Sequence, residues 1–165
     1  MRAIYLTGFM GAGKSTIGRE LSKALNLPVI DTDDYIEKNK VKKIKNIFET
    51  EGETAFRSYE REALKVLPIE DVIITTGGGI VIQQENREWM FSHGTVIFLH
   101  CDFDIIIERL KHDTSRPLFN HEQITRTEKL YQDRLPFYQE AHYTIDTSNK
   151  EVDDIVNEIK VKVKK

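Results

Sequence analysis

The sequence lacks the features of several protein classes, beginning with disulfides and membrane spans. Its 165 residues include one cysteine, Cys101, which cannot form an internal disulfide. This excludes a disulfide-stapled scaffold and fits a reducing compartment such as the cytoplasm. No apolar run approaches the roughly 20 residues that cross a bilayer, and residues 1–8 become glycine-rich too early for the core of a signal peptide. We therefore expect a soluble, cytoplasmic protein without a membrane partner.

A surplus of positive charge is also missing. The formal net charge is −3, whereas proteins with general affinity for nucleic acid usually carry a basic surplus. We interpret the lysine-rich segment 160–165 as a solvated helix end. The five histidines show neither metal-ligand spacing nor a paired nucleophile. We expect no nucleic-acid partner, and a bound anion must be held by a few specific cations.

Repeats, low-complexity segments and linkers rich in Pro, Gly or Ser are absent, which favours one domain over residues 1–165. Short apolar runs alternate with longer amphipathic ones. This predicts an α/β fold, a three-layer sandwich around a parallel sheet of about five strands, with ligands beyond the carboxyl ends of the strands. The predicted strands are 3–7, 28–31, 72–76, 96–100 and 143–146, and the predicted helices are 14–25, 33–39, 44–50, 52–66, 84–91, 103–111, 124–139 and 152–163.

A glycine-rich loop follows the first predicted strand. Residues 8–15 read GFMGAGKS, which matches GxxxxGK[ST] between a strand and a helix. In this P-loop motif, backbone N–H groups face phosphate oxygens, Lys14 reaches the β- and γ-phosphates, and Ser15 offers its hydroxyl to Mg²⁺. The alternative is a plain glycine-rich turn before a helix. The motif in its context predicts a nucleoside triphosphate site formed by Gly11, Ala12, Gly13, Lys14, Ser15 and Thr16.

The nucleotide motif does not by itself separate a kinase from a switch. A GTPase switch would normally add the motifs DxxG and NKxD. No glycine of this chain has an Asp three residues before it, and residues 149–153, NKEVD, place the Asp one position too far. These absences weaken the hypothesis of a GTPase.

Acidic residues end the second predicted strand. Because side chains alternate along an extended chain, Asp31 and Asp33 are predicted to face the phosphate loop while Asp34 turns away. One carboxylate would then hold Mg²⁺, and the other would accept a hydrogen bond from an attacking hydroxyl. The alternative is that Asp31 or Thr32 caps the helix that begins near Asp33.

Six short motifs occur in one order along nearly the whole chain. They are GFMGAGKST (8–16), DTD (31–33), FR (56–57), TTGGG (75–79), RPL (116–118) and RLPFY (134–138). In order and spacing the chain resembles the shikimate kinases, which use ATP to phosphorylate the 3-hydroxyl of shikimate on the route to chorismate and the aromatic amino acids. The resemblance implies a fold like that of P-loop nucleoside-monophosphate kinases, with a substrate-binding helical segment at about 33–62 and a mobile lid at about 112–123.

The resemblance also implies a set of substrate contacts. Arg57 and Arg134 match positions that bind the carboxylate of shikimate, and Glu60 is spaced to hold the Arg57 guanidinium. The glycine run, defined here as Gly77, Gly78 and Gly79, would let the backbone approach the substrate and offer it an N–H. The alternatives are a solvated Arg57–Glu60 helix pair, a surface Arg134 and a flexible glycine turn. Phe48 and Phe56 resemble an apolar pocket wall and are equally plausible as core residues.

Nucleotide contacts beyond the phosphate loop come from the same resemblance. Arg116, in the predicted lid, would reach the transferring phosphoryl group as the lid closes and excludes water. Arg109 matches the position that stacks on adenine, while Asn149 and Lys150 lie in the loop that covers the other face of the base. The segment after RPL, FNH, departs from the commoner run of leucines.

The resulting hypothesis is direct transfer of the γ-phosphoryl group of MgATP to shikimate. Lys14, Arg116 and Mg²⁺ would supply positive charge, and Asp33 would orient the hydroxyl or take its proton. Ser15 and Asp31 would serve the metal. The competing hypotheses are another small-molecule kinase, for gluconate or a nucleoside, and a nucleotide-dependent binding module without transfer. No interface signature stands out, so we expect a monomer by default.

Overall fold

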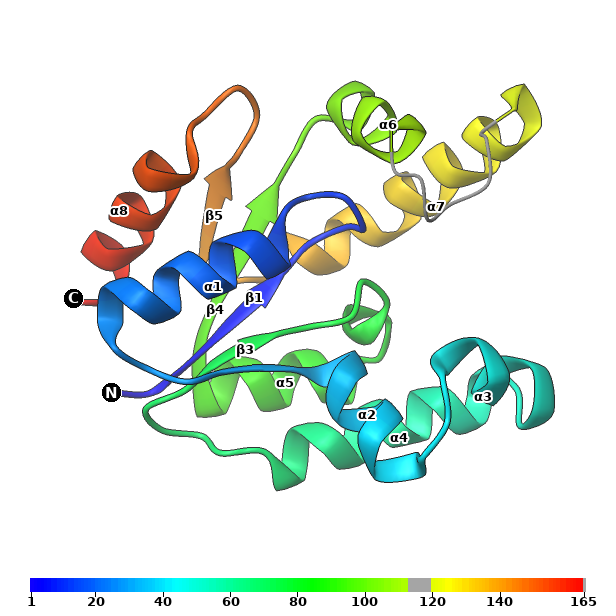
Figure 1. Ribbon diagram of the computed structural model, residues 1–165, viewed down its shortest axis with the longest axis horizontal. Coiled ribbons are helices and arrows are strands. Elements are labelled where there is room, and N and C mark those ends of the chain that lie inside the picture. Colours follow the sequence, from blue (N-terminus) through cyan, green and yellow to red (C-terminus); the bar gives the residue numbers. More distant parts are fainter. Residues whose placement is uncertain (113–119, 165) are drawn as a thin grey trace.

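The computed structural model describes residues 1–112 and 120–164 of the chain. Five parallel strands form one sheet in the order β2-β3-β1-β4-β5 (Figure 1). The strands are β1 (Ala3–Thr7), β2 (Val29–Asp31), β3 (Ile73–Thr75), β4 (Gly94–His100) and β5 (Tyr143–Asp146). The helices are α1 (Lys14–Leu25), α2 (Thr32–Lys40), α3 (Ile44–Thr50), α4 (Glu53–Val66), α5 (Gln84–His93), α6 (Phe103–Lys111), α7 (His121–Tyr138) and α8 (Val152–Val163), with one 3₁₀ turn, η1 (Ile80–Ile82).

The central strand β1 shows why helices cover both faces of the sheet. All five of its residues are buried, so neither face can be left to water. Ile4 and Leu6 pack with apolar residues of α1 and α8, whereas Ala3 and Tyr5 pack with those of α4, α5, α6 and α7. The alternation expected of a pleated strand therefore places helices on both sides. This confirms the predicted three-layer α/β sandwich with a five-stranded parallel sheet.

Helix α1 lies unusually close to the sheet. A Cβ atom added to Gly18 would stand 2.6 Å from the Thr75 Cγ2 atom, closer than nonbonded carbons can approach. Glycine at this position therefore brings the helix that follows the phosphate loop into direct contact with β3.

The helices α2, α3 and α4 also pack against one another. They share a small apolar cluster of Ile36, Ile47, Phe56 and Ala63. Figure 1 shows these helices on one side of the carboxyl ends of the strands, with α6 and α7 on the other side. The loops that follow β1 and β3 emerge between the two groups, and β2, the neighbour of β3 in the sheet, leads directly into α2.

Two helix starts differ from the sequence prediction because of capping. Helix α7 begins at His121 and not at 124, since the Asn120 side chain accepts a hydrogen bond from the Gln123 N–H while the Gln123 side chain accepts one from the Asn120 N–H. The last residues of the predicted lid are therefore helical, and 113–119 lie outside the described residues. Helix α2 begins at Thr32 because Asp31 caps it.

The helix ends and turns show two further differences. Helix α7 contains Pro136 and runs two residues past it to Tyr138, one residue short of the predicted end at 139. The 3₁₀ turn after the glycine run was not predicted. Among residues 1–112 and 120–164, no helix combines the length and apolarity that crossing a bilayer requires.

Candidate active site

The loop between β1 and α1 has the shape expected of a phosphate cradle. Gly8, Gly11 and Gly13 all have positive φ, and a Cβ on Gly8 would lie 2.8 Å from the Leu99 carbonyl oxygen. The Lys14 ammonium sits inside this curl, where Nζ donates to the carbonyls of Gly8 at 2.6 Å and Phe9 at 3.0 Å. The loop thus presents a cation at the amino end of α1.

The protonation of Lys14 is tuned by its surroundings. Burial lowers the pKa of the Lys14 ammonium to about 8, while the nearby carboxylates of Asp33 and Asp31 act in the opposite direction. The side chain therefore stays mainly protonated at neutral pH. It remains able to neutralise negative charge on a phosphate.

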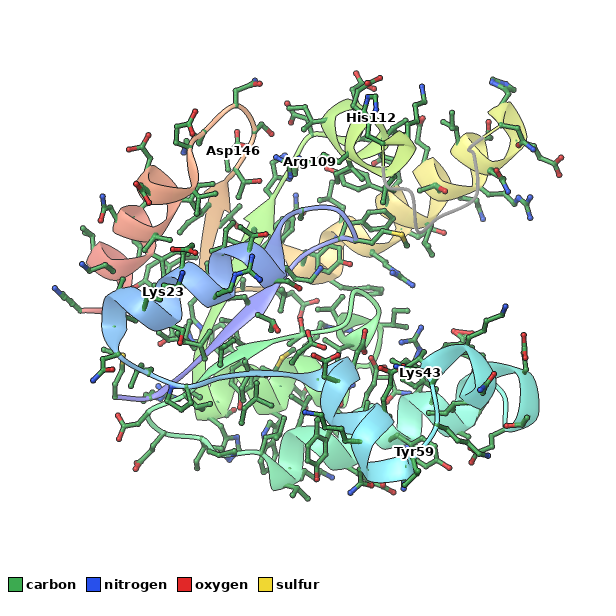
Figure 2. All side chains as sticks on the ribbon, viewed as in Figure 1. Lys23, Lys43, Tyr59, Arg109, His112 and Asp146 are labelled. Carbon is green, nitrogen blue, oxygen red and sulfur yellow. The ribbon has the colours of Figure 1, made fainter. Side chains whose placement is uncertain are left out.

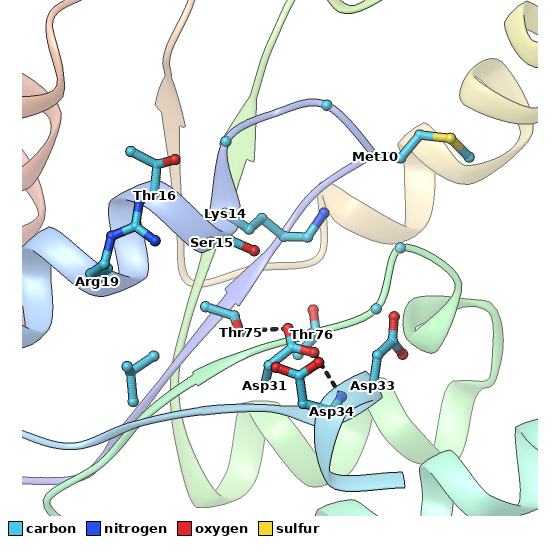
Figure 3. A pocket seen from close by; sticks show the side chains of 15 residues that line it. Met10, Lys14, Ser15, Thr16, Arg19, Asp31, Asp33, Asp34, Thr75 and Thr76 are labelled. Atoms are coloured by element: carbon cyan, nitrogen blue, oxygen red, sulfur yellow. Dashed lines mark hydrogen bonds between the residues drawn. The ribbon is translucent and has the colours of Figure 1, made fainter. Parts of the chain in front are cut away.

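A cavity of about 650 Å³ opens beside this loop (Figure 3). Its lining joins the phosphate loop to the ends of β2 and β3, so residues far apart in the sequence share one space. Among the predicted site residues, the lining includes Gly11, Gly13, Lys14, Ser15, Thr16, Asp31, Asp33, Gly77 and Gly78. Arg19, Asp34 and Thr75 also line it, and the sequence prediction missed all three.

The acidic residues at the end of β2 line the cavity, but not for the reason that the sequence analysis gave. Alternation along a strand cannot relate Asp31 to Asp33, because the strand ends at Asp31 and Asp33 lies in the first turn of α2. Asp34 does not turn away, since its side chain lies close to Asp31 in the same cavity. The capping alternative is correct for Asp31, whose Oδ2 accepts from the Asp34 N–H at 3.0 Å.

Asp31 is held at both carboxylate oxygens. Its Oδ1 accepts a hydrogen bond from the Thr75 hydroxyl at 2.8 Å, in addition to the Oδ2 bond at the helix cap. Each oxygen keeps a free lone pair, since a carboxylate has about four acceptor sites. The side chain is therefore fixed in place and still able to bind a cation or its water ligands.

Asp33 is the least satisfied acid of the site. Its buried Oδ1 atom receives no hydrogen bond from any residue in the described part of the chain. Burial raises the pKa of Asp33 to about 6, the negative charge of Asp31 adds to this, and Lys14 opposes it. A buried acceptor without a donor is suited to a hydroxyl group of a ligand.

The glycine run occupies the meeting point of three site side chains. A Cβ on Gly77 would stand 2.6 Å from the Asp33 Oδ1, and one on Gly79 would stand 2.5 Å from the Arg57 Nη1. A Cβ on Gly78 would approach Arg134 Nη1 to 3.4 Å. None of the three glycines has positive φ, so an unusual backbone conformation is not the reason for glycine at these positions. Room for neighbouring side chains is what requires glycine here.

Arg57 forms a buried ion pair and not the solvated pair of the alternative hypothesis. Its Nη1 donates to the Glu60 Oε1 at 2.8 Å, and the two side chains are 12% and 0% exposed. Burial raises the pKa of Glu60 to about 7, although Arg57 pulls it down. The pairing fixes the guanidinium of Arg57 against the glycine run.

Arg134 also faces the site. Its guanidinium carbon lies 5.9 Å from the centre of the Phe9 ring, beside the phosphate loop, so the surface alternative is wrong. One helical turn later, the Tyr138 hydroxyl donates to the Gly78 carbonyl at 2.5 Å, a contact that the sequence did not predict. Of the predicted apolar wall, Phe56 is buried in the α2–α4 cluster while Phe48 is 37% exposed.

A second cavity, of about 370 Å³, adjoins the other side of the phosphate loop. Arg109 and Lys150 line it together with Gly11 and Thr16. Arg109 Nη1 donates to the Gly11 carbonyl at 2.9 Å, and Figure 2 shows this arginine on α6 facing the loop. The prediction for the base-binding residues is therefore compatible with this cavity. Arg116 lies outside the described residues.

Asn149 and Ser148 occupy the turn between β5 and α8. Asn149 has φ of 58°, a left-handed conformation that Asn adopts more readily than most residues. The Ser148 hydroxyl accepts from the Asp102 N–H at 2.9 Å and so ties this turn to the start of α6. Asn149 does not line the cavity, whereas its neighbour Lys150 does.

Comparison with known proteins gives one consistent result. The family model described as "Shikimate kinase" matches residues 10–164. The shikimate kinase of Bacillus cereus (strain AH187) is 53% identical over 163 residues, which are 99% of both chains. That of Sulfurihydrogenibium sp. (strain YO3AOP1) is 37% identical and covers all of this chain and 99% of its own.

The solved structures agree. The shikimate kinase from Acinetobacter baumannii in complex with shikimate superimposes with a TM-score of 0.89 at 35% identity, over 99% of this chain and 93% of that one. The crystal structure of shikimate kinase from Bacteroides thetaiotaomicron gives a TM-score of 0.90 at 32% identity, over 99% of each chain. With the family model, the curated relatives and the solved structures in agreement over almost its whole length, the chain belongs to the shikimate kinase family.

Proposed function

We propose that this protein transfers the γ-phosphoryl group of ATP to the 3-hydroxyl of shikimate, giving shikimate 3-phosphate on the route to chorismate. The observation that carries the proposal is the meeting of Asp33, Arg57 and Arg134 on one glycine run, at the edge of the cavity that contains Lys14. A triphosphate on the loop and a small hydroxy acid on the glycine run would then be neighbours.

The acid end of the substrate fits the two arginines. A guanidinium is planar and offers parallel N–H donors that match the two oxygens of a carboxylate. Arg57 is held by Glu60 through Nη1 and, at 3.4 Å, by the exposed Glu53 through Nη2, so that its Nε and the other hydrogens of its two Nη atoms would serve a ligand. Among residues 1–112 and 120–164, the buried Nε atoms of Arg57 and Arg134 have no acceptor, so each can donate to a carboxylate of a ligand.

The hydroxyl end fits Asp33. Its pKa of about 6 keeps it mainly ionised above neutral pH, where it accepts a hydrogen bond from the attacking hydroxyl. The hydroxyl oxygen forms a bond to the γ-phosphorus, the bond from that phosphorus to the β,γ-bridging oxygen breaks, and ADP leaves. Because the transition state is loose, the proton passes to Asp33 late, and orientation by Asp33 contributes most.

The phosphate end fits the loop and its lysine. On binding, phosphate oxygens would replace the Gly8 and Phe9 carbonyls as acceptors for the Lys14 ammonium. By the resemblance, Arg116 would add a second positive charge to the transferring phosphoryl group. Arg109, Asn149 and Lys150 are proposed to surround the base.

Magnesium fits the donors at the mouth of the loop. Ser15 and Asp31 line the same cavity, and the Asp31 carboxylate is fixed but retains free lone pairs. In the described part of the chain no group of three acid, Cys or His side chains is placed to hold a metal. The protein would therefore supply few ligands, and phosphate oxygens and water the rest, as Mg²⁺ prefers. When bound, Mg²⁺ neutralises phosphate charge and orients the triphosphate.

We further propose that the protein works in the cytoplasm as a monomer, from its lone buried cysteine and the lack of an interface signature in the sequence. Light scattering coupled to size-exclusion chromatography measures the mass directly. A mass of one chain, 19.2 kDa, is expected.

The deciding experiment measures ADP release from purified protein and MgATP, with and without shikimate. Release that depends on shikimate is expected, together with a new phosphomonoester signal in ³¹P NMR. Gluconate and adenosine serve as competing acceptors. Phosphorylation of either in preference to shikimate would assign another kinase activity, and no transfer to any acceptor would favour a nucleotide-dependent binding module.

A further inference from the structure

Helix α7 contacts the glycine run through two residues of one face. Arg134 and Tyr138 are four residues apart and so lie one above the other on the helix. A Cβ on Gly78 would stand 3.4 Å from the Arg134 Nη1 and 3.7 Å from the Tyr138 hydroxyl oxygen. The proposed function uses only the arginine. The tyrosine is buried, at 1% exposure, and has no role in that mechanism.

The hydroxyl of Tyr138 fixes the direction of one peptide group. It donates to the Gly78 carbonyl at 2.5 Å. The described chain has no cis peptide bonds, so the C=O of Gly78 and the N–H of Gly79 lie in one plane and point in opposite directions. A bond that holds this carbonyl toward α7 therefore holds the Gly79 N–H away from α7. The Ile80 N–H donates to the Gly77 carbonyl at 3.1 Å and closes a turn around this peptide. Such a turn exists with the central peptide in either of two orientations, and glycine at both central positions allows both.

In the described part of the chain, the remaining hydrogen bonds of this segment hold the neighbouring residues. The Gly77 N–H donates to the Thr32 hydroxyl at 3.0 Å, and the Thr76 hydroxyl donates to the Leu6 carbonyl at 2.9 Å. The Tyr138 ring is itself fixed, since it stacks on Phe98 with centroids 5.1 Å apart. Burial raises the pKa of the Tyr138 hydroxyl to about 12, so the group remains a donor at any working pH.

We infer that Tyr138 is a positioning residue for the acceptor substrate: its hydroxyl clamps the Gly78 carbonyl and thereby aims the Gly79 N–H at the bound hydroxy acid. This inference rests on the proposed function for the identity of the substrate. The clamp itself is a property of the protein without ligands. Tyr138 touches neither substrate in this scheme.

The chain offers a matched control for the test. Tyr131, two turns earlier on α7, also has a buried ring and donates its hydroxyl to a backbone carbonyl, that of Cys101, at 3.0 Å. This carbonyl follows β4 and not β3, away from the glycine run. Tyr138→Phe and Tyr131→Phe therefore each remove one hydroxyl from one buried tyrosine of the same helix, and both keep the aromatic ring.

The experiment compares wild type and both variants by steady-state kinetics. Tyr138→Phe should raise the KM for shikimate about fivefold to tenfold, the factor that one typical hydrogen bond supplies, with the KM for ATP within about twofold. Tyr131→Phe should leave the KM for shikimate unchanged. Thermal unfolding of both variants checks that they fold. An unchanged KM for shikimate in Tyr138→Phe, or an equal rise in both variants, overturns the inference.

A second readout separates this inference from the proposed function. The ¹³C signal of the Gly78 carbonyl and the ¹⁵N signal of the Gly79 amide, measured by NMR on glycine-labelled protein without ligands, should shift in Tyr138→Phe, because this carbonyl loses its donor. Both signals should stay in place in Tyr131→Phe. If wild type does not phosphorylate shikimate, the proposed function fails while these signals still test the clamp. Identical signals in all three proteins would overturn the clamp whatever the substrate.

Discussion

The two sides of the cleft are built in different ways. The phosphate-binding part of the nucleotide side is one continuous stretch, residues 8–16, in which glycines, lysine and serine take their places by local backbone geometry. The acid side is assembled from α2, α4, α7 and the end of β3, which meet only through tertiary packing. A phosphate loop can therefore serve many kinases. The side that selects the substrate depends on contacts between distant segments, and disturbing any one of them should affect that side alone.

The largest effect is expected at Asp33, which is proposed to bind the hydroxyl that attacks the γ-phosphorus. Asp33→Asn should lower kcat by about 100-fold to 10,000-fold, the range typical of a lost general base, while nucleotide binding persists. Stopped-flow or steady-state kinetics with a fluorescent-nucleotide binding assay measure both. Asp34→Asn, the neighbouring acid of the same cavity, is the control and should lose much less. Full activity of Asp33→Asn would remove Asp33 from the reaction.

Crowding the glycine run should damage the acid side selectively. Gly79→Ala forces a Cβ to within 2.5 Å of the Arg57 guanidinium, and overpacking of this kind costs about 1–3 kcal/mol. We expect the KM for shikimate to rise roughly 10-fold to 100-fold and the KM for ATP to stay the same. Gly78→Ala, whose nearest contact is 3.4 Å, should be milder. Equal losses for both substrates would show that the two sides are not independent.

The acid side should also carry the pH dependence of stability near neutrality. The pKa of Glu60, raised by burial to about 7, lies above that of the unfolded chain. The folded protein therefore keeps a proton that the unfolded chain loses between about pH 4.5 and 7, and the free energy of unfolding falls as the pH rises through this window. Burial shifts the pKa of Asp33 in the same direction.

Glu60→Gln isolates this contribution. The fall in the free energy of unfolding from pH 5 to pH 7 should be smaller than in wild type by about 2 kcal/mol. Urea unfolding at several pH values measures it. Glu62→Gln changes an exposed acid of the same helix and should reproduce the wild-type profile. Parallel profiles for wild type and Glu60→Gln would mean that Glu60 is ionised throughout.

The smallest effect is expected where α7 begins, away from both sides. Asn120→Ala removes one half of the capping box and should lower the free energy of unfolding by about 1 kcal/mol. The KM for shikimate should not change, because Arg134 and Tyr138 lie at the other end of the helix. Differential scanning calorimetry with kinetics checks this. A marked change in that KM would mean that the start of α7 helps to position its end.

Sequence reasoning succeeded where the signal is local. The phosphate loop, the five strands and the amphipathic helices are encoded in short windows, so their order and approximate bounds could be predicted. The position of the site beyond the carboxyl ends of the strands followed from the parallel topology. The resemblance added Arg57, Arg134 and the glycine run, which composition and spacing alone leave ambiguous.

What the sequence did not predict depends on tertiary contacts. Tyr138 bonds to a carbonyl 60 positions away, and nothing in its own surroundings signals that. The direction of the Asp34 side chain was predicted wrongly, because the prediction treated residues 31–34 as extended. Asp31 instead caps α2, so the extended chain ends there. The paired threonines of TTGGG were a usable signal, since polar side chains at a buried strand end need partners, and Thr75 finds Asp31.

The close contact between Gly18 and Thr75 sets the distance between the phosphate loop and Asp31. Helix α1 carries Lys14 and Ser15 at its start, and its fifth residue rests directly on Thr75, whose hydroxyl holds Asp31. The distance between Lys14 and Asp31 therefore depends on the absence of a side chain at position 18. A larger residue at position 18 would push α1 away from β3. Lys14 and Ser15 would then be misaligned with Asp31, although the substituted residue contacts none of them.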